Sequence, residues 1–210
     1  MIQRLRAAAR ARFADVVLDI YEWLHRKAAI VAGSRHAARF GRFGRGSLIC
    51  FPPQVIYNEH AIHVGEDTII GPGCSLTVGM APGQELLAPT MLEIGDRCVI
   101  GRNSAIAAHL QIIIGDDVYF APNVFVTDQN HGADEAGVPI GRQTQPERPV
   151  SIGARSWLAT GVVVTPGVTI GEDVIVGANS VVTIDLPAGS IAVGAPARII
   201  GHSNSDRPPR

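Results

Sequence analysis

The sequence predicts a mainly β protein in which short strands of a six-residue repeat stack into a triangular parallel solenoid behind an N-terminal helix. Aliphatic residues recur at every sixth position over most of the chain, and small residues follow many of them. The N-terminal residues instead have the spacing of an amphipathic helix. Gly and Pro are abundant, with 23 and 14 residues, whereas only 5% of residues are aromatic. A fixed period of six is typical of a repeat architecture.

Apolar residues near the N-terminus share one helical face, so we expect a helix from residue 3 to about 31 that ends near Gly33. These residues are Leu5, Ala9, Phe13, Val16, Val17, Ile20 and Leu24. Up to Arg45 the chain carries ten basic and three acidic residues, and the remainder carries eight basic and sixteen acidic ones. We therefore expect a basic helix and linker (1–45), a β-helix domain (46–201) and a flexible tail (202–210).

The repeat is clearest in the C-terminal half of the chain. Its aliphatic residues there are Ile152, Leu158, Val164, Ile170, Val176 and Val182. The same register runs through Ile94, Ile100, Ile106 and Ile112, restarts two residues late at Ile114, Phe120 and Val126, and is traceable at Val64, Ile70 and Leu76. Six residues make about one short strand and a turn, so three repeats form one coil. Stacked coils would bury a continuous aliphatic column.

The three cysteines do not predict disulfides, since their number is odd and no secretory signal precedes them. Cys74 and Cys98 lie four residues after Ile70 and Ile94, in the position that the repeat reserves for small residues. We expect both to be packed core thiols. Cys50 precedes the clear register, and its role is left open.

Three stretches carry a resemblance to a known family: "IGDDVYFAPNVFV", "IGARSWLATGVVVTPGVTIGEDVIVGANSVV" and "VGAPARII". Over roughly residues 60 to 200 the chain resembles the hexapeptide-repeat acyltransferases, and within them the sugar O-acetyltransferases. The resemblance implies a left-handed parallel β-helix, acetyl-CoA as co-substrate, and a homotrimer whose site lies between neighbouring subunits. The left hand comes from the family, because a period alone does not determine it.

Two segments interrupt the repeat and are expected to leave the coil as loops, which is where specific chemistry is usually placed. From Val126 to Ile152 the interval is 26 residues, so we expect about eight residues to form a loop. The second segment runs from Thr77 to Met91 and is rich in Pro and Gly.

His131 begins the long loop and is the candidate general base. Ala121, Pro122 and Asn123, followed by a strand and His131, match the family's spacing for its catalytic histidine. An imidazole with a pKa near 6.5 is suited to removing a hydroxyl proton at neutral pH.

The neighbours of His131 have alternative assignments. Asp128 or a backbone carbonyl could orient its ring, and Asn130 could contact the acceptor. Both residues could equally be ordinary turn residues.

Coenzyme A recognition is expected from the edges of the coils, because no Gly-rich nucleotide loop enters a helix. By resemblance, the pantetheine channel would be lined by Trp157, Ala159 and Thr160, and its thiol end held near Gly177 and Ala178. Thr183 and Arg198 would reach the phosphate end, where a guanidinium can pair bidentately with phosphate. Trp157 could instead cover a coil, and Arg198 could form a surface ion pair.

The chain departs from the family at several positions. Ile184 and Gly201 stand where relatives often carry basic residues for coenzyme A, and Gly101 and His109 stand where some relatives have an active-site Asn and an acidic residue. His109 is therefore either a second active-site residue or a coil-edge residue. The acceptor pocket is more affected by these departures than the reaction.

The leading functional hypothesis is a CoA-dependent O-acetyltransferase acting on a sugar or glycoconjugate hydroxyl, with no metal. One alternative is a zinc lyase of the carbonic anhydrase type, with ligands drawn from His60, His63, His109 and His131, although a catalytic zinc needs three protein ligands. Another is a non-catalytic scaffold, which the fold does not exclude.

The basic helix has two candidate roles. It could pack on the protein's own trimer, or it could be drawn to anionic lipid or a membrane-bound protein. Nucleic acid is not expected as a partner, because no aromatic stacking residues or recognised motif accompany the arginines. The chain has no secretory signal and no run of 18 apolar residues, so we expect a cytoplasmic protein, which the lipid alternative would place at the membrane periphery.

Overall fold

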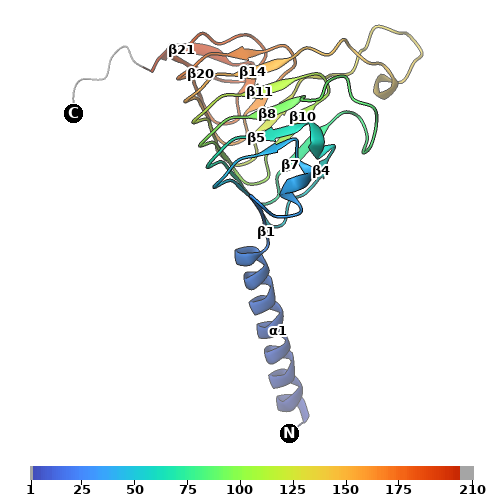
Figure 1. The fold of residues 1–210 in the computed structure, drawn as a ribbon, viewed down its shortest axis with the longest axis vertical. Helices are drawn as coiled ribbons and strands as arrows, with labels where there is room; N and C mark the ends of the chain where they lie inside the picture. The colour runs from blue at the N-terminus through green and yellow to red at the C-terminus, as the bar shows by residue number, and fades with distance from the viewer. Residues whose placement is uncertain (1, 204–210) are drawn as a thin grey trace, which may run out of the picture.

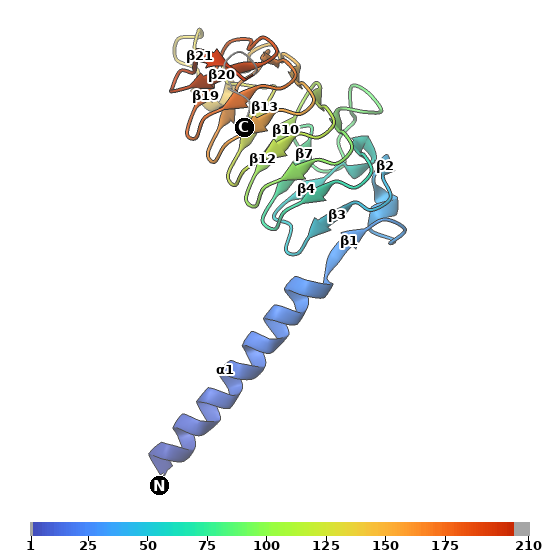
Figure 2. The same ribbon diagram turned by 90° about the vertical axis from the view of Figure 1, so that its left-hand side faces the viewer.

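The computed structural model describes residues 2–203 and shows a triangular β-helix with one long helix projecting from its N-terminal end (Figures 1 and 2). The chain begins with helix α1 (Ile2–Lys27) and then winds through three mainly parallel sheets that form the sides of the prism. Three short 3-10 helices interrupt the coils: η1 (Ala37–Arg39), η2 (Glu59–Ala61) and η3 (Ile140–Arg142). Within the described chain, no helix is both long and apolar enough to cross a membrane.

Each coil contributes one strand to each sheet, and sheet A has three further strands at its ends, of which the first and the last pair antiparallel with their neighbours. Sheet A is nine-stranded and contains β1 (Ala29–Val31), β3 (Leu48–Cys50), β6 (Ile69–Ile70), β9 (Val99–Ile100), β12 (Tyr119–Phe120), β15 (Trp157–Leu158), β18 (Ile175–Val176), β20 (Ser190–Val193) and β21 (Arg198–His202). Sheet B contains β2 (Arg42–Phe43), β5 (Ile62–Val64), β8 (Leu92–Ile94), β11 (Ile112–Ile114), β14 (Val150–Ile152) and β17 (Thr169–Ile170). Sheet C contains β4 (Ile56–Tyr57), β7 (Ser75–Val78), β10 (Ala105–Ala108), β13 (Phe125–Thr127), β16 (Val163–Val164) and β19 (Val181–Val182).

The predicted aliphatic column forms the core of the prism. Leu158 pairs with Phe120 and Val176 on neighbouring strands, and all three side chains are buried. Ile106 and Val126 are stacked in the same way on sheet C. Because successive strand residues point to opposite faces, one residue in two faces this core. The period of six is confirmed as one strand and one corner per side.

Cys74 and Cys98 are confirmed as core thiols. Both are buried, and each thiol donates a hydrogen bond to a carbonyl oxygen of the next coil, Gly101 at 3.2 Å and Gly115 at 3.1 Å respectively. Burial raises the pKa of each to about 11, because a thiolate is poorly solvated there. Cys50 is partly buried and is a free thiol, as are the other two.

The helix is shorter than predicted and the prism begins earlier. Helix α1 ends at Lys27 rather than near residue 31, because Ala29–Val31 pairs antiparallel with β3 and satisfies its backbone groups there. Strand β2, inside the predicted linker, already pairs with β5 in sheet B. The predicted tail begins at residue 202, but 204–210 lie outside the described residues.

The long loop is much longer than the eight residues predicted. Strand β13 ends at Thr127 and β14 begins at Val150, so residues 128–149 leave the coil. The predicted eight residues are what remains when a full coil of three six-residue repeats is subtracted from the 26-residue interval. Val126 and Ile152 instead lie on adjacent sides of the prism, where a single repeat would separate them, so the insertion is longer. The other predicted loop, from Thr77 to Met91, is confirmed. Thr77 still belongs to β7, and residues 79–91 form the loop.

Candidate active site

His131 lies at the corner where the chain passes from sheet C to sheet B, at the start of the long loop. The loop folds back on itself there: His131 forms an antiparallel bridge with Thr144. The Gly132 N–H donates to the Gln143 carbonyl (3.0 Å), and the Gln145 N–H donates to the Asn130 carbonyl (3.2 Å). The histidine is thus held on a short two-stranded ladder at the edge of the prism.

The His131 ring contacts a backbone carbonyl. Its Nδ1 atom lies 3.3 Å from the carbonyl oxygen of Gln143. A carbonyl only accepts hydrogen bonds, so this contact places the proton of the neutral ring on Nδ1 and leaves the Nε2 lone pair available. The side chain of His131 is exposed, so Nε2 is in a position to meet a substrate.

Gln143 anchors the part of the loop that orients His131. Its side chain is 5% exposed; its amide nitrogen donates to the carbonyls of Val138 (2.8 Å) and Glu135 (3.1 Å), and its Oε1 accepts from the Glu135 N–H (3.0 Å). The side chain therefore ties the outer part of the loop to the strand that carries the orienting carbonyl. Sequence reasoning missed Gln143, since no local pattern signals a pairing across twelve residues of loop.

The carboxylate of Asp128 is engaged with backbone groups, which matches its alternative interpretation as a turn residue rather than as the residue that orients the His131 ring. The residue is fully buried, and its carboxylate accepts hydrogen bonds from the backbone N–H groups of His109 (2.7 Å), Leu110 (2.8 Å) and Gln111 (2.7 Å). These three residues form the corner between β10 and β11, where the repeat restarts two residues late. The carboxylate thus stabilises the two-residue insertion in the coil below.

Asn130 and His109 lie at the same corner as His131. Asn130 Oδ1 accepts the backbone N–H of His131 (2.9 Å), which is the contact of a turn residue, although the side chain is exposed. His109 is partly buried, and its Nδ1 atom is buried without a hydrogen-bond partner among the described residues. The geometry is compatible with either predicted role of His109.

A cavity of about 460 Å³ opens beside His131, between the two excursions. It is lined by Met80, Gln129, Thr144, Gln145, Pro146 and Glu147. Thr144 is the bridge partner of His131, and residues opposite each other in an antiparallel pair have side chains on the same face. Gln129 precedes His131 by two residues in the chain. The cavity offers amide, hydroxyl and carboxylate groups, which can bind the hydroxyls of an acceptor.

The residues predicted to bind coenzyme A lie mainly at a different corner. Trp157 faces outward from sheet A, and the corner between sheets A and C follows it with Ala159 and Thr160; Gly177 and Ala178 repeat this corner one coil later. Backbone hydrogen bonds link these two successive coils: the Asn179 N–H donates to the Thr160 carbonyl (2.8 Å), and the Ala159 N–H donates to the Val176 carbonyl (2.9 Å). Sheet C separates this corner from His131 within one chain.

Thr183 and Arg198, predicted at the phosphate end of coenzyme A, are not adjacent either. Thr183 follows β19 at the corner between sheets C and B, the corner of His131, whereas Arg198 begins β21 on sheet A. Both side chains are exposed, and the Arg198 guanidinium donates to the Ala197 carbonyl (2.8 Å). One chain therefore displays the predicted site on two edges of the prism.

No group of three His, Cys, Asp or Glu side chains in the described part of one chain could hold a metal ion. His63 is instead engaged with Thr90, whose hydroxyl lies 3.1 Å from its Nε2 atom. The histidines weighed as zinc ligands thus do not converge within a chain.

Comparison with known proteins identifies the family. A family described as "Bacterial transferase hexapeptide (six repeats)" matches residues 149–183, and one described as "Hexapeptide repeat of succinyl-transferase" matches residues 92–128. A putative lipopolysaccharide biosynthesis O-acetyltransferase of Escherichia coli is 32% identical over 171 residues, covering 78% of this chain and 83% of the relative. The chain belongs to the hexapeptide-repeat acyltransferases.

Other members show how far the likeness extends. A probable acetyltransferase of Mycobacterium tuberculosis is 39% identical over 109 residues, but the match spans only 36% of that protein and 52% of this chain. A hexapeptide-repeat acetyltransferase of Vibrio cholerae, solved with acetyl-CoA, superposes with a TM-score of 0.56 at 24% identity, covering 80% of this chain and 74% of that one. The shared fold is the left-handed parallel β-helix, as predicted. Membership of this family makes the protein an acyltransferase.

Proposed function

We propose that this hexapeptide-repeat acyltransferase is a CoA-dependent O-acetyltransferase that moves an acetyl group from acetyl-CoA to a hydroxyl of a sugar or glycoconjugate. The observation that carries the proposal is the contact of His131 Nδ1 with the Gln143 carbonyl, which leaves Nε2 available as a base near the cavity that Thr144, the bridge partner of His131, helps to line. The E. coli relative, named as an O-acetyltransferase of lipopolysaccharide biosynthesis, supports a glycan acceptor. The Vibrio cholerae protein of the same fold supports acetyl-CoA as the donor.

His131 would act in both halves of the transfer. Nε2 accepts the acceptor's hydroxyl proton as the oxygen attacks the thioester carbonyl carbon. The carbon–sulfur bond then breaks, and the imidazolium returns the proton to the leaving thiolate. The products are the O-acetyl ester and the free thiol of coenzyme A, and the imidazole is regenerated.

A homotrimer with the site between subunits accounts for the division of the predicted residues. His131 lies at the corner between sheets C and B, and Ala159 and Gly177 lie at the corner between sheets A and C. Closed cyclic symmetry brings the two corners of neighbouring copies together around an axis. The exposed apolar residues Tyr119 and Trp157, paired on the outer face of sheet A, are consistent with such a contact.

The test is acetyl transfer by a His131→Ala variant, screened by mass spectrometry with acetyl-CoA against sugars, nucleotide sugars and small amines. We expect the wild type to acetylate a hydroxyl of at least one sugar, and the variant to lose about 10²- to 10⁴-fold in rate, the contribution typical of a general base. His60→Ala, an exposed histidine on a lower coil, should retain the rate. A folded His131→Ala protein with wild-type transfer would refute the mechanism.

Two other outcomes would favour the alternative functions. Stoichiometric zinc that is lost together with activity would favour the lyase, and an absence of CoA binding by calorimetry would favour the scaffold. The cytoplasmic location stays a prediction.

A further inference from the structure

One face of helix α1 is apolar and lies open to solvent. Phe13, Val16, Val17 and Ile20 are 70%, 54%, 46% and 55% exposed. Their spacing places them on one side of the helix, which projects away from the prism (Figures 1 and 2). These four residues are called the helix face below. An amphipathic helix is normally stabilised by burying such a face against another surface.

The charge around the helix face disfavours an anionic lipid surface. From Phe13 to Leu24 the helix contains Asp15, Asp19 and Glu22 but no Lys or Arg. Arg4, Arg6, Arg10 and Arg12 precede this segment, and Arg26 and Lys27 follow it at the end of the helix. Membrane-surface helices pair their apolar face with basic residues that attract anionic headgroups. The exposed apolar segment is acidic instead, so its partner should be basic.

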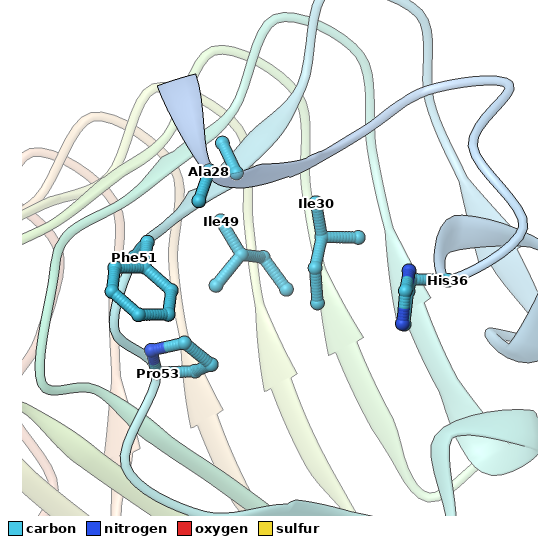
Figure 3. Close-up of a pocket in the computed structure, with 7 residues that line it drawn as sticks. Ala28, Ile30, His36, Ile49, Phe51 and Pro53 are labelled. Atoms are coloured by element: carbon cyan, nitrogen blue, oxygen red, sulfur yellow. The ribbon is translucent and has the colours of Figure 1, made fainter. Parts of the chain in front are cut away.

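A second apolar surface lies at the base of the prism, where the first coil has no coil beneath it. A cavity of about 450 Å³ opens there, lined by Ala28, Ala29, Ile30, His36, Ile49, Phe51 and Pro53. Figure 3 shows Phe51, Ile49, Ile30 and His36 side by side across it. The ends of repeat proteins require a cover, because the terminal repeat otherwise exposes its core face. This opening is called the base cavity.

The surroundings of the base cavity are basic. The segment from residue 35 to 45 carries Arg35, Arg39, Arg42 and Arg45 and no carboxylate. Three of them contact carboxylates of the coils, Arg39 with Glu59 at 2.8 Å, Arg45 with Glu66 at 3.6 Å and Arg42 with Asp96 at 4.0 Å, and Arg35 is exposed at the edge of the segment. The side chains of Arg39, Arg42 and Arg45 stay 61%, 54% and 89% exposed, so their guanidinium groups are still accessible to carboxylates of another chain.

The helix face and the base cavity do not meet within one chain. Helix α1 ends at Lys27, and Ala29 already pairs with Cys50 in sheet A. The Ala28 N–H donates to the Leu24 carbonyl (2.8 Å), so the helical hydrogen bonds continue to the first strand and fix the direction of the helix. Folding the helix back over its own base would break this junction.

We propose that the helix face of one copy docks across the base cavity of a second copy of this chain. Each copy would give one helix and receive one, a head-to-tail contact that closes into a ring when the rotation between copies permits. The contact would bury the helix face, cover the end of the aliphatic column and bring the acidic segment close to the basic base. This inference concerns assembly and does not depend on the proposed reaction.

Hydrogen exchange of α1 in the full-length protein tests the docking, with two matched substitutions. Ile20→Glu places a carboxylate in the helix face, and Leu18→Glu places one at a position just as exposed (58% against 55%) but on the opposite side of the helix. We expect Ile20→Glu to speed exchange of the α1 amides by about ten- to a hundredfold, since burial of one aliphatic side chain is lost. Leu18→Glu should leave the exchange rates close to those of the wild type.

Photo-cross-linking identifies the surface that receives the helix. p-Benzoylphenylalanine replaces Ile20 in a co-assembled mixture of ¹⁴N- and ¹⁵N-labelled chains, and cross-linked peptides are sequenced by mass spectrometry. We expect mixed-label cross-links to the peptide that contains residues 49–53, and none when the probe replaces Leu18. Cross-links between two α1 helices, or α1 protection that arises only with vesicles of phosphatidylglycerol and phosphatidylcholine, would overturn the proposal. So would α1 exchange that is equally fast in the wild type and in Ile20→Glu.

Discussion

His131 depends on the backbone of a residue twelve positions further along the chain. The Gln143 carbonyl contacts its Nδ1 atom, and the Gln143 side chain holds the loop that carries this carbonyl. Because a carbonyl only accepts hydrogen bonds, the contact directs the Nδ1 edge of the ring to the loop and the Nε2 edge to solvent. This orientation is the one that the proposed transfer requires.

Asp128 is a structural residue, and its replacement should destabilise the corner formed by residues 109–111 in the preceding coil. In Asp128→Asn one acceptor oxygen becomes an amide group that faces a backbone N–H of residues 109–111. We expect a loss of about 2–4 kcal/mol of unfolding free energy, because a buried hydrogen bond to a charged group is replaced by an unsatisfied pair of donors. Urea denaturation measures this. Asn130→Ala, at an exposed neighbouring position, is the control and should lose less than about 1 kcal/mol.

The two core thiols predict how stability changes with pH. Burial raises the pKa of Cys74 and of Cys98 from 9.0 to about 11. Below about pH 9 the thiols are protonated in both states, so they add no pH dependence. As pH rises from 9.0 toward 11 the unfolded thiols ionise first, so the unfolding free energy falls.

Urea denaturation across this alkaline range measures the fall. The Cys74→Ala/Cys98→Ala protein is the control, and it should lack this part of the decline although it is less stable at neutral pH. An equal alkaline decline in both proteins would show that the thiols do not cause it.

Among the structural elements, the corners of the coils restrict which residue types the repeat can contain, because they require a particular backbone conformation. Positive φ values recur at one position of many corners, occupied by Asn103, Asn123, Asp173 and Asn179 among others, and by Gly at Gly161. Asn, Asp and Gly tolerate this left-handed conformation better than other residues. The conformation turns the chain sharply enough to start the next strand.

A substitution at one such corner tests this reading. Asn123 has a φ of 64°, so Asn123→Val should cost about 1–2 kcal/mol or more, because a β-branched side chain is strained there. Asn123→Gly should be close to neutral. Thermal unfolding of the two variants measures the difference, and equal midpoints would contradict the role assigned to the corner.

At the scale of the whole molecule, the two edges of the prism predict complementation between chains. His131→Ala removes the proposed base at one corner, and Ala178→Trp blocks the predicted path of coenzyme A at the other. Each variant alone should be inactive. Co-assembled trimers should regain up to about a quarter of wild-type activity if each site takes one corner from each of two neighbours. Native mass spectrometry verifies that mixed trimers have formed. If these trimers remain inactive, His131 and the coenzyme A corner do not act together across two chains.

Most of the fold could be predicted from the sequence, because the repeat is local. Ile152 and Leu158 lie six residues apart, and this spacing alone places both in the column. The errors lie where residues leave the period: the long loop was predicted at about eight residues but spans residues 128–149, and Ala29–Val31 was predicted as helix but pairs with β3. Neither the pairing partner of a strand nor the length of an insertion follows from periodicity.

The architecture, the family and the selection of His131 follow from local sequence, since periodic burial and a short motif are properties of neighbouring residues. Three features emerged from the folded chain alone: Asp128 supports a corner, the Gln143 carbonyl contacts the histidine, and the predicted coenzyme A residues lie mainly on another edge. These facts depend on contacts between residues far apart in the chain. Such contacts are set by how the coils stack and how the loop returns, and no local pattern encodes them.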